Sequence, residues 1–465
     1  MSFRPSHSSL MPSTWFIFAV MSIRIVNAKI VNEGKVSEGD VLIRNGRIER
    51  IGNSGSTPVA REIDAAGKHL MPGVIDDQVH FREPGLTHKG TIFTESRAAV
   101  AGGVTSFMEM PNTAPPVFTH QLLEEKYAIA SKTSAANFSF YMGTSNDNYE
   151  EVMRTDLSRV CGLKIFMGSS TGNLLVDQPE TLEKIFSSFQ GLIATHCEYE
   201  PLVRQRTQAF KEQYGERATA DLHPVIRNEE ACYLSSSMAV ELAKKHGTRL
   251  HVLHISTEKE THLFSNDLPL EKKKITAEAC VHHLWFSDAD YARLGNLIKW
   301  NPAVKSAADR EGIFKALLED RIDVIATDHA PHTMEEKAKP FFEAPSGGPL
   351  IQHTLVAMLE YYHQGKISLE KIVQKMAHHP AILFRIKDRG FIREGYWADL
   401  VLVDMNAPWT VSKENILAKC GWSPFEGNQF RSRVYQTIVS GEVVYDSGKI
   451  TDGLGGQRLE FMLSN

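Results

Sequence analysis

The sequence predicts an α/β protein, a (β/α)8 barrel of the TIM type with a small β-sandwich-like domain formed by both chain ends. Three observations predict this fold. Short apolar runs alternate with longer charged stretches of helical period, which is typical of repeated βα units. Eight such runs lie between residues 69 and 330, close to the span of about 250 residues that a barrel needs. Both chain ends instead alternate with the period of two that marks β-strands.

The chain ends are predicted to form hairpins. Strand-like runs occur at residues 23–31, 39–44, 47–51, 398–404, 434–439 and 442–445. Asn45-Gly46 is a strong signal for a tight turn between two strands. We therefore expect a composite β domain from residues 21–68 and 386–465, with the barrel in residues 69–385.

The barrel region shows strands and helices in alternation. The expected strands are residues 69–81, 103–110, 137–143, 162–167, 192–197, 249–255, 275–279 and 323–327. Glu229–His246 carries apolar residues at the 3.6-residue spacing of an amphipathic helix. A further helix is expected near Leu350–His363.

The composition excludes several classes of protein. Hydrophobic residues make up 42% of the 465 residues and charged residues 23%, so the chain as a whole is not disordered, collagen-like or a coiled coil. With 51 basic and 56 acidic residues, the net charge is −5, which gives no electrostatic attraction for nucleic acid. A small molecule is the expected partner.

The cysteines and the N-terminal segment indicate the cellular compartment of the protein. Five cysteines without a CxxC pair predict neither a disulfide framework nor a zinc ribbon, so a reducing, cytoplasmic compartment is expected. The apolar run at residues 15–21 is shorter than the about 20 residues that span a bilayer, and no cleavage site follows it. Residues 1–20 are predicted to be a tail, either disordered or preceding the true start at Met21, and no membrane association is expected.

Polar residues recur where the predicted barrel strands end, which is where barrels carry their chemistry. A single histidine at a strand end is more often a hydrogen-bonded core or surface group than a metal ligand. Repetition on several strands of one barrel favours a site. These residues are Gln78, His80, Arg82, Asn112, Lys164, His196, His254, Asp328 and His332.

Imidazole and carboxylate together suit zinc, and His80, His196, His254 and Asp328 are the natural ligands. Lys164 ends an otherwise apolar strand, where an ammonium is costly unless it is paired or neutralised. Reaction with carbon dioxide would turn it into a carbamate that can bridge two cations. The alternative is an ion pair of Lys164 with Asp328 or Glu278.

Six segments together resemble the dihydroorotase branch of the amidohydrolase superfamily, and the resemblance covers Met21 to the C-terminus. They are Pro72–Gly85 (PGVIDDQVHFREPG), Met110–Thr113 (MPNT), Gly162–Met167 (GLKIFM), Ala194–Glu198 (ATHCE), Leu253–Thr257 (LHIST) and Ala326–His332 (ATDHAPH).

The resemblance implies a metal-dependent hydrolase with one or two zinc ions. Its metal ligands would be His80, carboxylated Lys164, His196, His254 and Asp328. The substrate carboxylate would be held by Arg82, Asn112 and His332. Arg82 is the residue that best distinguishes a dihydroorotase from the related hydantoinases and allantoinases. The ring substrates of those enzymes have no carboxylate there for a bidentate guanidinium to bind. The alternative for Arg82 is an ion pair with Glu83 or Glu109.

The implied reaction is the reversible hydrolysis of the cyclic amide of (S)-dihydroorotate to N-carbamoyl-L-aspartate, a step of pyrimidine (UMP) biosynthesis. A metal lowers the pKa of water and polarises the amide carbonyl, and Asp328 would act as general base and then general acid. The resemblance also suggests a homodimer.

One departure from the family pattern stands out. The first motif ordinarily reads His-x-His, and Gln78 replaces its first histidine. Since an amide oxygen is a weak zinc ligand, the metal position of the first strand and Asp328 should be weakened. Strand alternation should turn the neighbouring Asp77 away from the face of Gln78 and His80.

Three segments are expected near the substrate. Asn301–Lys305 and Ala344–His353 differ from the family and should line the pocket, and Glu335–Ser346 is a candidate lid. Two alternatives remain: another cyclic amidohydrolase that acts on a hydantoin or allantoin, or a non-catalytic partner of aspartate transcarbamoylase.

Overall fold

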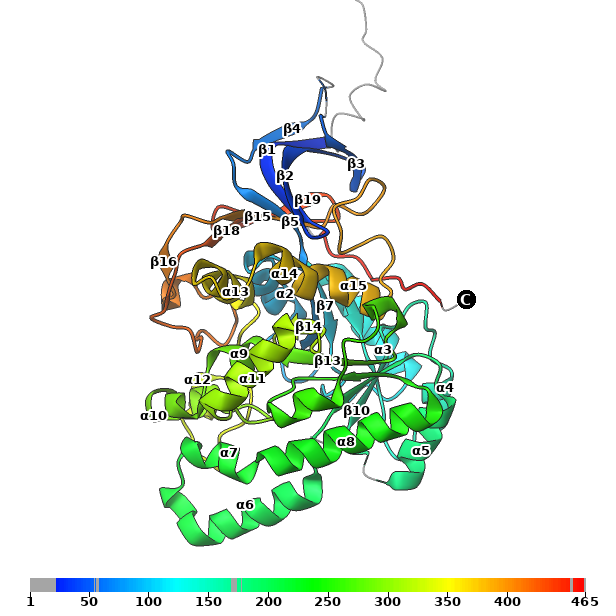
Figure 1. Ribbon diagram of the computed structural model, residues 1–465, viewed down its shortest axis with the longest axis vertical. Coiled ribbons are helices and arrows are strands. Elements are labelled where there is room, and N and C mark those ends of the chain that lie inside the picture. The colour runs from blue at the N-terminus through cyan, green and yellow to red at the C-terminus, as the bar shows by residue number, and fades with distance from the viewer. Residues whose placement is uncertain are drawn as a thin grey trace, which may run out of the picture.

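The structure of the protein is a computed structural model that describes residues 22–53, 55, 58–168, 174–176, 178–451 and 455–463. The predicted tail at residues 1–20 lies outside the described residues. Two parts are visible, a barrel surrounded by helices and a β-sheet stacked against one end of it (Figure 1).

The barrel confirms the predicted (β/α)8 fold. Two parallel sheets, β6-β7-β8 and β9 to β14, form its wall, and a parallel bridge between Val79 and His329 joins the first strand to the segment that follows the last one. Its strands are β6 (Val74–Val79), β7 (Val104–Glu109), β8 (Asn137–Phe140) continued by β9 (Met142–Gly143), β10 (Leu163–Phe166), β11 (Leu192–His196), β12 (Arg249–Val252), β13 (Ile275–Cys280) and β14 (Val324–Ala326).

Helices cover the outside of the barrel. The helix predicted at Glu229–His246 is present as α8, where Asn228 caps the first turn by accepting from the Ala231 N–H and Gly247 ends the helix with a φ of 68°. The others are α2 (Ile92–Ala101), α3 (His120–Thr133), α4 (Tyr149–Met153), α5 (Pro179–Ser188), α6 (Glu200–Tyr214), α7 (His223–Ile226), α9 (Val281–Trp285), α10 (Tyr291–Leu294), α11 (Ala307–Leu318), α12 (Met334–Lys337), α13 (Thr354–His363), α14 (Leu369–Val373) and α15 (His379–Phe384).

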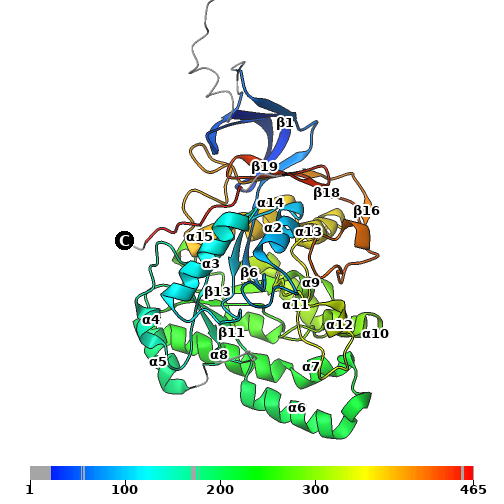
Figure 2. The same cartoon turned by 180° about the vertical axis from the view of Figure 1, so that it is seen from behind.

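Both chain ends contribute to a nine-stranded sheet, ordered β20-β19-β18-β15-β5-β1-β2-β3, with β4 beside β1. The two ends meet where β15 runs antiparallel to β5. Figure 2 shows this sheet above α2, α13 and α14. The strands are β1 (Ser22–Asn32), β2 (Lys35–Arg44), β3 (Arg47–Gly52), β4 (Arg61–Asp64), β5 (His69–Pro72), β15 (Leu400–Asp404), β18 (Arg433–Val439), β19 (Glu442–Asp446) and β20 (Lys449–Ile450).

The predicted Asn45-Gly46 turn joins β2 and β3, with φ values of 52° and 79°. Positive φ at both positions matches a tight hairpin turn, whose twist suits the flanking strands. Some buried apolar side chains of this sheet, such as Ile25, Ile43 and Leu400, form a core of their own, whereas others, such as Val401 and Val439, belong to the core of the barrel.

The expected first barrel strand, residues 69–81, is wrong as a single strand. Its first part is β5, which belongs to the nine-stranded sheet, and only β6 belongs to the barrel. Gly73 separates them, and a Cβ there would lie 2.1 Å from Thr105 Oγ1. The chain can pass this point only without a side chain, so the run changes sheet at the glycine.

Parts of the C-terminal region pack on the barrel rather than in the nine-stranded sheet. Single bridges join Phe138 to Arg458 and Ile386 to Phe461. The two short strands β16 (Trp409–Thr410) and β17 (Gln429–Phe430) pair with each other. Among the described residues, no helix combines the length and the apolar character that crossing a membrane requires.

Candidate active site

A cavity of about 300 Å³ lies at the carboxyl ends of the barrel strands. All nine of the strand-end residues selected from the sequence line it: Gln78, His80, Arg82, Asn112, Lys164, His196, His254, Asp328 and His332. Because they come from β6, β7, β10, β11, β12 and β14 or the segments after them, the barrel alone brings them together. Asn301 and Pro345–Gly347 also line the cavity, as expected of their segments.

His80 connects two of the predicted residues. Its Nδ1 lies 2.7 Å from Asn112 Oδ1 and its Nε2 lies 3.1 Å from Asp328 Oδ1. Burial lowers the pKa of His80, although Asp328 acts in the opposite direction. Asn112 therefore orients the ring so that Nε2 faces the carboxylate.

His196 and His254 form a second pair. Nδ1 of His196 lies 2.9 Å from Nε2 of His254, and Nε2 of His196 lies 2.9 Å from Glu198 Oε2. Arg227 donates to the same Glu198 oxygen at 2.6 Å. Burial acts to raise the pKa of Glu198, but Arg227 and His196 outweigh it and hold that pKa well below its ordinary value. A permanently charged carboxylate thus fixes the His196 ring from behind.

Lys164 is buried and lines the cavity. Burial lowers the pKa of its ammonium group to about 7, although Asp328 and Glu278 act in the opposite direction. Within the described part of the chain, neither carboxylate forms an ion pair with it, so the structure does not show the alternative pairing. Its Nζ lies 4.6 Å from the centre of the Phe166 ring.

Arg82 and His332 stand side by side. Arg82 Nε donates to the Pro331 carbonyl at 3.1 Å, and its Nη2 lies 3.1 Å from His332 Nε2. On the other side of the ring, Lys89 Nζ lies 3.0 Å from His332 Nδ1. Burial and the charges of Arg82 and Lys89 lower the pKa of His332 far below its ordinary value, so the imidazole is neutral.

The guanidinium of Arg82 is available for a ligand. Glu109 instead pairs with Lys126 at 3.1 Å, and Glu83 accepts from the Ile92 N–H at 2.9 Å. In the described ranges Arg82 has no ion pair, so the expected alternative partners are engaged elsewhere. Burial lowers the pKa of Arg82 only to about 10, which leaves it charged at neutral pH.

Comparison with known proteins shows the family to which this chain belongs. The model of the amidohydrolase family matches residues 69–444. A dihydroorotase of Halobacterium salinarum is 32% identical over 433 residues, covering 92% of this chain and 98% of the relative. The chain belongs to the amidohydrolase family.

Other relatives of this amidohydrolase have related names. An allantoinase of Solibacter usitatus is 32% identical and covers 93% of the chain and 95% of the relative. The structure of an L-hydantoinase (dihydropyrimidinase) from Arthrobacter aurescens superposes with a TM-score of 0.89 at 26% identity, covering 94% of this chain and 99% of that one. The protein is thus a hydrolase of the group that acts on cyclic amides.

Gln78 lines the cavity of this amidohydrolase, and its Oε1 lies 3.7 Å from Cys280 Sγ. Asp77 does not line the cavity, in agreement with strand alternation. However, the β6–β7 register shifts between Asp76 and Val79, and Asp77 stays inside the barrel, with Oδ2 3.1 Å from His251 Nε2. A strand irregularity that the sequence does not reveal sets this orientation.

The sequence did not single out several polar neighbours of the amidohydrolase cavity. They are Lys89, Glu198, Arg227 and His251. For Glu198, the His-x-Glu spacing at the end of β11 was an available signal, because residues two apart on a strand share a face. The others come from elements distant in sequence and carry no such signal.

Proposed function

We propose that this protein is a dihydroorotase, which reversibly hydrolyses the cyclic amide of (S)-dihydroorotate to N-carbamoyl-L-aspartate in pyrimidine biosynthesis. The observation that carries the proposal is the Arg82 guanidinium, which forms no ion pair among the described residues and lines the same cavity as Asn112, His332, His80 and Asp328. A buried cation without a carboxylate partner suits an anionic substrate. The dihydroorotase relative of Halobacterium salinarum supports the same substrate.

The donor set fits a divalent metal, with zinc as our proposal. His80 Nε2 faces Asp328 Oδ1, and His196 Nδ1 faces His254 Nε2. Glu198 accepts from the outer nitrogen of His196, which leaves Nδ1 as the lone-pair atom, and such carboxylate–histidine pairs are common behind metal ligands. One or two ions would be held by His80, Lys164, His196, His254 and Asp328. When bound, the metal would lower the pKa of the attacking water and polarise the amide carbonyl.

We propose that Lys164 is carboxylated. Its pKa of about 7 leaves a large fraction of neutral amine near pH 7, and the neutral amine is the form that attacks carbon dioxide. The carbamate would replace a buried ammonium without an ion pair by a two-oxygen anion among the histidines.

The remaining side chains would position the substrate and move its protons. Arg82 would hold the substrate carboxylate through paired N–H donors, with Asn112 and neutral His332 beside it. Asp328 would accept the proton of the attacking water and pass it to the leaving ring nitrogen. A carboxylate next to both reacting atoms is required for this exchange.

We also propose a cellular location and partners for the protein. A cytoplasmic location, a homodimer and an association with aspartate transcarbamoylase would each suit an enzyme of pyrimidine synthesis. All five cysteines are free in the structure, in agreement with a reducing compartment.

The test is turnover of dihydroorotate and N-carbamoyl-aspartate by zinc-loaded protein at neutral and alkaline pH. We expect hydrolysis and cyclisation, and a loss of roughly 100-fold in kcat/KM in Arg82→Ala, because a hydrogen bond to a charged group contributes about 1.5–3 kcal/mol. Arg204→Ala is the control, because this arginine is exposed on α6 and pairs with Glu200. It should leave turnover unchanged.

Three outcomes would contradict the proposal. Absence of turnover in both directions would reject the activity. Faster turnover of a hydantoin or allantoin, unaffected by Arg82→Ala, would move the protein to the neighbouring activity. Near-zero metal content with co-elution on aspartate transcarbamoylase would favour the non-catalytic alternative.

A further inference from the structure

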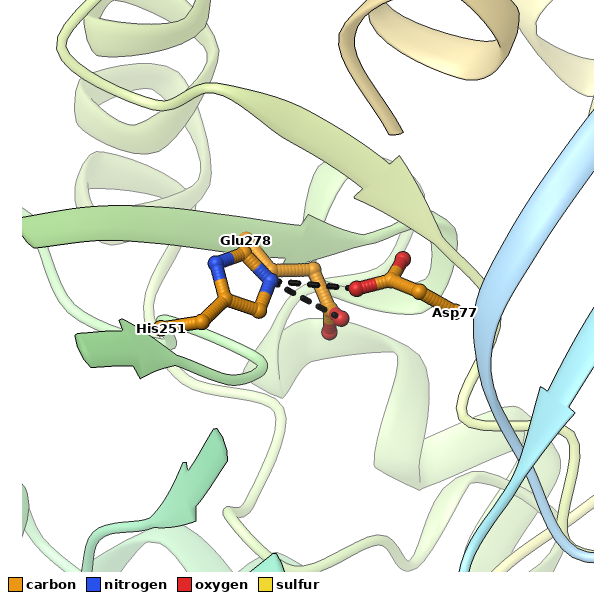
Figure 3. A group of neighbouring side chains, drawn as sticks. All are labelled: Asp77, His251 and Glu278. Atoms are coloured by element: carbon orange, nitrogen blue, oxygen red, sulfur yellow. Dashed lines mark hydrogen bonds and ion pairs between the residues drawn. The ribbon is translucent and has the colours of Figure 1, made fainter. Parts of the chain in front are cut away.

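A second group of metal-type ligands lies inside the barrel, outside the cavity lining. Asp77, His251 and Glu278 come from β6, β12 and β13, and their side chains are fully buried. Figure 3 shows both carboxylates pointing at Nε2 of His251. That nitrogen lies 3.1 Å from Asp77 Oδ2 and 3.8 Å from Glu278 Oε2.

The hydrogen bonds behind His251 fix which ring nitrogen carries a proton. Thr276 Oγ1 donates its own hydrogen to the Leu250 carbonyl at 3.1 Å. The same hydroxyl lies 2.9 Å from His251 Nδ1, so its oxygen accepts from Nδ1–H. In the neutral ring, Nε2 is therefore the lone-pair atom, and it faces two carboxylates.

In that neutral form, three lone-pair atoms converge without a hydrogen between them and repel one another, so the arrangement favours a cation at their centre, either a proton on Nε2 or a metal ion. Asp77 Oδ1 and Glu278 Oε2 are buried and have no hydrogen-bond partner, although buried polar atoms are normally satisfied. Burial by itself lowers the pKa of His251, but Asp77 and Glu278 outweigh it and raise that pKa to about 9. The position attracts positive charge.

The charge of the three side chains can be balanced by a divalent ion. With one proton on His251, the three side chains keep a net charge of −1 in a fully buried place. With a divalent cation and neutral imidazole, the net charge is zero. Buried charge is tolerated when it is compensated in this way.

We propose that Asp77, His251 and Glu278 bind a divalent transition-metal ion such as Zn²⁺, at a site separate from the catalytic cavity. One imidazole nitrogen and two carboxylates are ligands that zinc accepts. The ion would tie β6, β12 and β13 together. Through Glu278, whose Oε1 accepts from the His254 N–H at 3.0 Å, it would also hold the backbone of a cavity residue.

The direct test is anomalous diffraction at the zinc edge from crystals of the zinc-loaded full chain. We expect a peak about 2.0–2.2 Å from His251 Nε2 and from an oxygen of each carboxylate. A map with density in the catalytic cavity but no peak here would overturn the proposal and assign the position to a proton on His251.

Metal content gives an independent measurement. His251→Asn keeps a donor for Thr276 but removes the imidazole ligand, so we expect about one zinc ion fewer per chain than in the wild type. His379→Asn is the matched control, because its buried imidazole contacts the Asp323 carbonyl at 2.8 Å away from the cluster. Equal zinc content in the wild type and a folded His251→Asn would contradict the site.

These measurements are independent of turnover. A peak at the cluster in an inactive protein would retain the buried site and reject only the proposed function. An active enzyme without the peak would retain the proposed function and reject only the buried metal site.

Discussion

Gln78 stands where the resemblance leads us to expect a histidine, and the structure shows what surrounds its amide. Cys280 Sγ lies 3.7 Å from Gln78 Oε1 and 3.1 Å from Glu278 Oε1. Burial raises the pKa of the Cys280 thiol well above its ordinary value, so it is a protonated donor. The thiol has one hydrogen and its nearer acceptor is Glu278 Oε1, so it does not satisfy the Gln78 amide oxygen, which remains a weaker zinc ligand than an imidazole.

We predict that Gln78→His raises metal occupancy beside His80 and Asp328. An imidazole is a stronger zinc ligand than an amide oxygen, and the gain in affinity should reach at least the roughly 10–100-fold that changes behind metal ligands produce. Anomalous scattering at this position, at limiting zinc, measures the effect. Occupancy between His196 and His254 in the same crystals is the internal control.

Full occupancy beside His80 in the parent protein, at the same limiting zinc, would contradict this prediction. It would mean that Asp328 and the other ligands suffice without a second histidine from β6.

The sequence predicted the cavity residues well because each follows its own strand. A barrel brings the ends of all its strands to one face, so His80, Lys164 and Asp328 could be grouped without knowledge of distances. The Asp77–His251 contact could not be predicted, since it depends on the register shift in β6 and on a partner 174 residues away. The tautomer-fixing bond from His251 to Thr276 has no sequence signature either.

At the scale of single elements, the junction between β5 and β6 decides how the chain passes from one sheet to the other. Gly73 packs directly on Thr105, a buried residue of β7. Threonine is branched at Cβ and has little rotamer freedom to move aside.

We predict that Gly73→Ala destabilises the protein by about 1–3 kcal/mol, the usual range for overpacking. The added Cβ would lie 2.1 Å from Thr105 Oγ1, so β5 or β7 must shift. Urea unfolding followed by circular dichroism measures the change.

Gly39→Ala in β2 is the matched control for this junction. Its Cβ would meet nothing closer than 3.5 Å, and it should change the unfolding free energy by no more than about 0.5 kcal/mol. Equal effects of the two substitutions would show that the contact with Thr105 is not limiting.

Elements with a clear period and clear ends were predicted closely, as α8 shows with its Asn228 cap and terminal Gly247. The division of residues 69–81 was missed because both halves are extended and follow one another without a recognisable turn. Periodicity does not reveal which sheet an apolar strand joins, and the glycine between them acts through a packing contact rather than a turn.

For the whole molecule, one buried ion pair connects three regions. Asp399 pairs with Arg389, and its Oδ1 accepts from the Ser440 N–H at 2.7 Å and from Asn137 Nδ2 at 3.0 Å. Asn137 belongs to barrel strand β8, whereas Asp399 and Ser440 adjoin strands of the nine-stranded sheet. Arg389 also donates to Gln457 Oε1 at 3.0 Å, so the C-terminal segment is attached as well.

We predict that Asp399→Asn costs about 3–5 kcal/mol, because it leaves the Arg389 charge buried without its partner. Thermal unfolding should show a lower Tm for the sheet and the barrel together. Glu460→Gln removes the partner of the exposed Lys387 and should change stability by at most about 1 kcal/mol. A comparable loss in both variants would contradict the role of burial.

The antiparallel pairing of β5 with β15 also delays completion of the nine-stranded sheet during synthesis of the chain. β5 pairs with β1 on one side, but it ends at Pro72 and β15 begins at Leu400, so about 330 residues must be added before β5 meets β15 on its other side. At about 5–20 residues per second, the ribosome needs roughly 15 to 65 seconds for that distance. Throughout this interval the nascent chain exposes an unpaired strand edge, which is a template for wrong pairing with other chains. The stage of synthesis most exposed to aggregation is therefore the one in which the barrel is being made, and it ends only when the second half of the sheet leaves the ribosome.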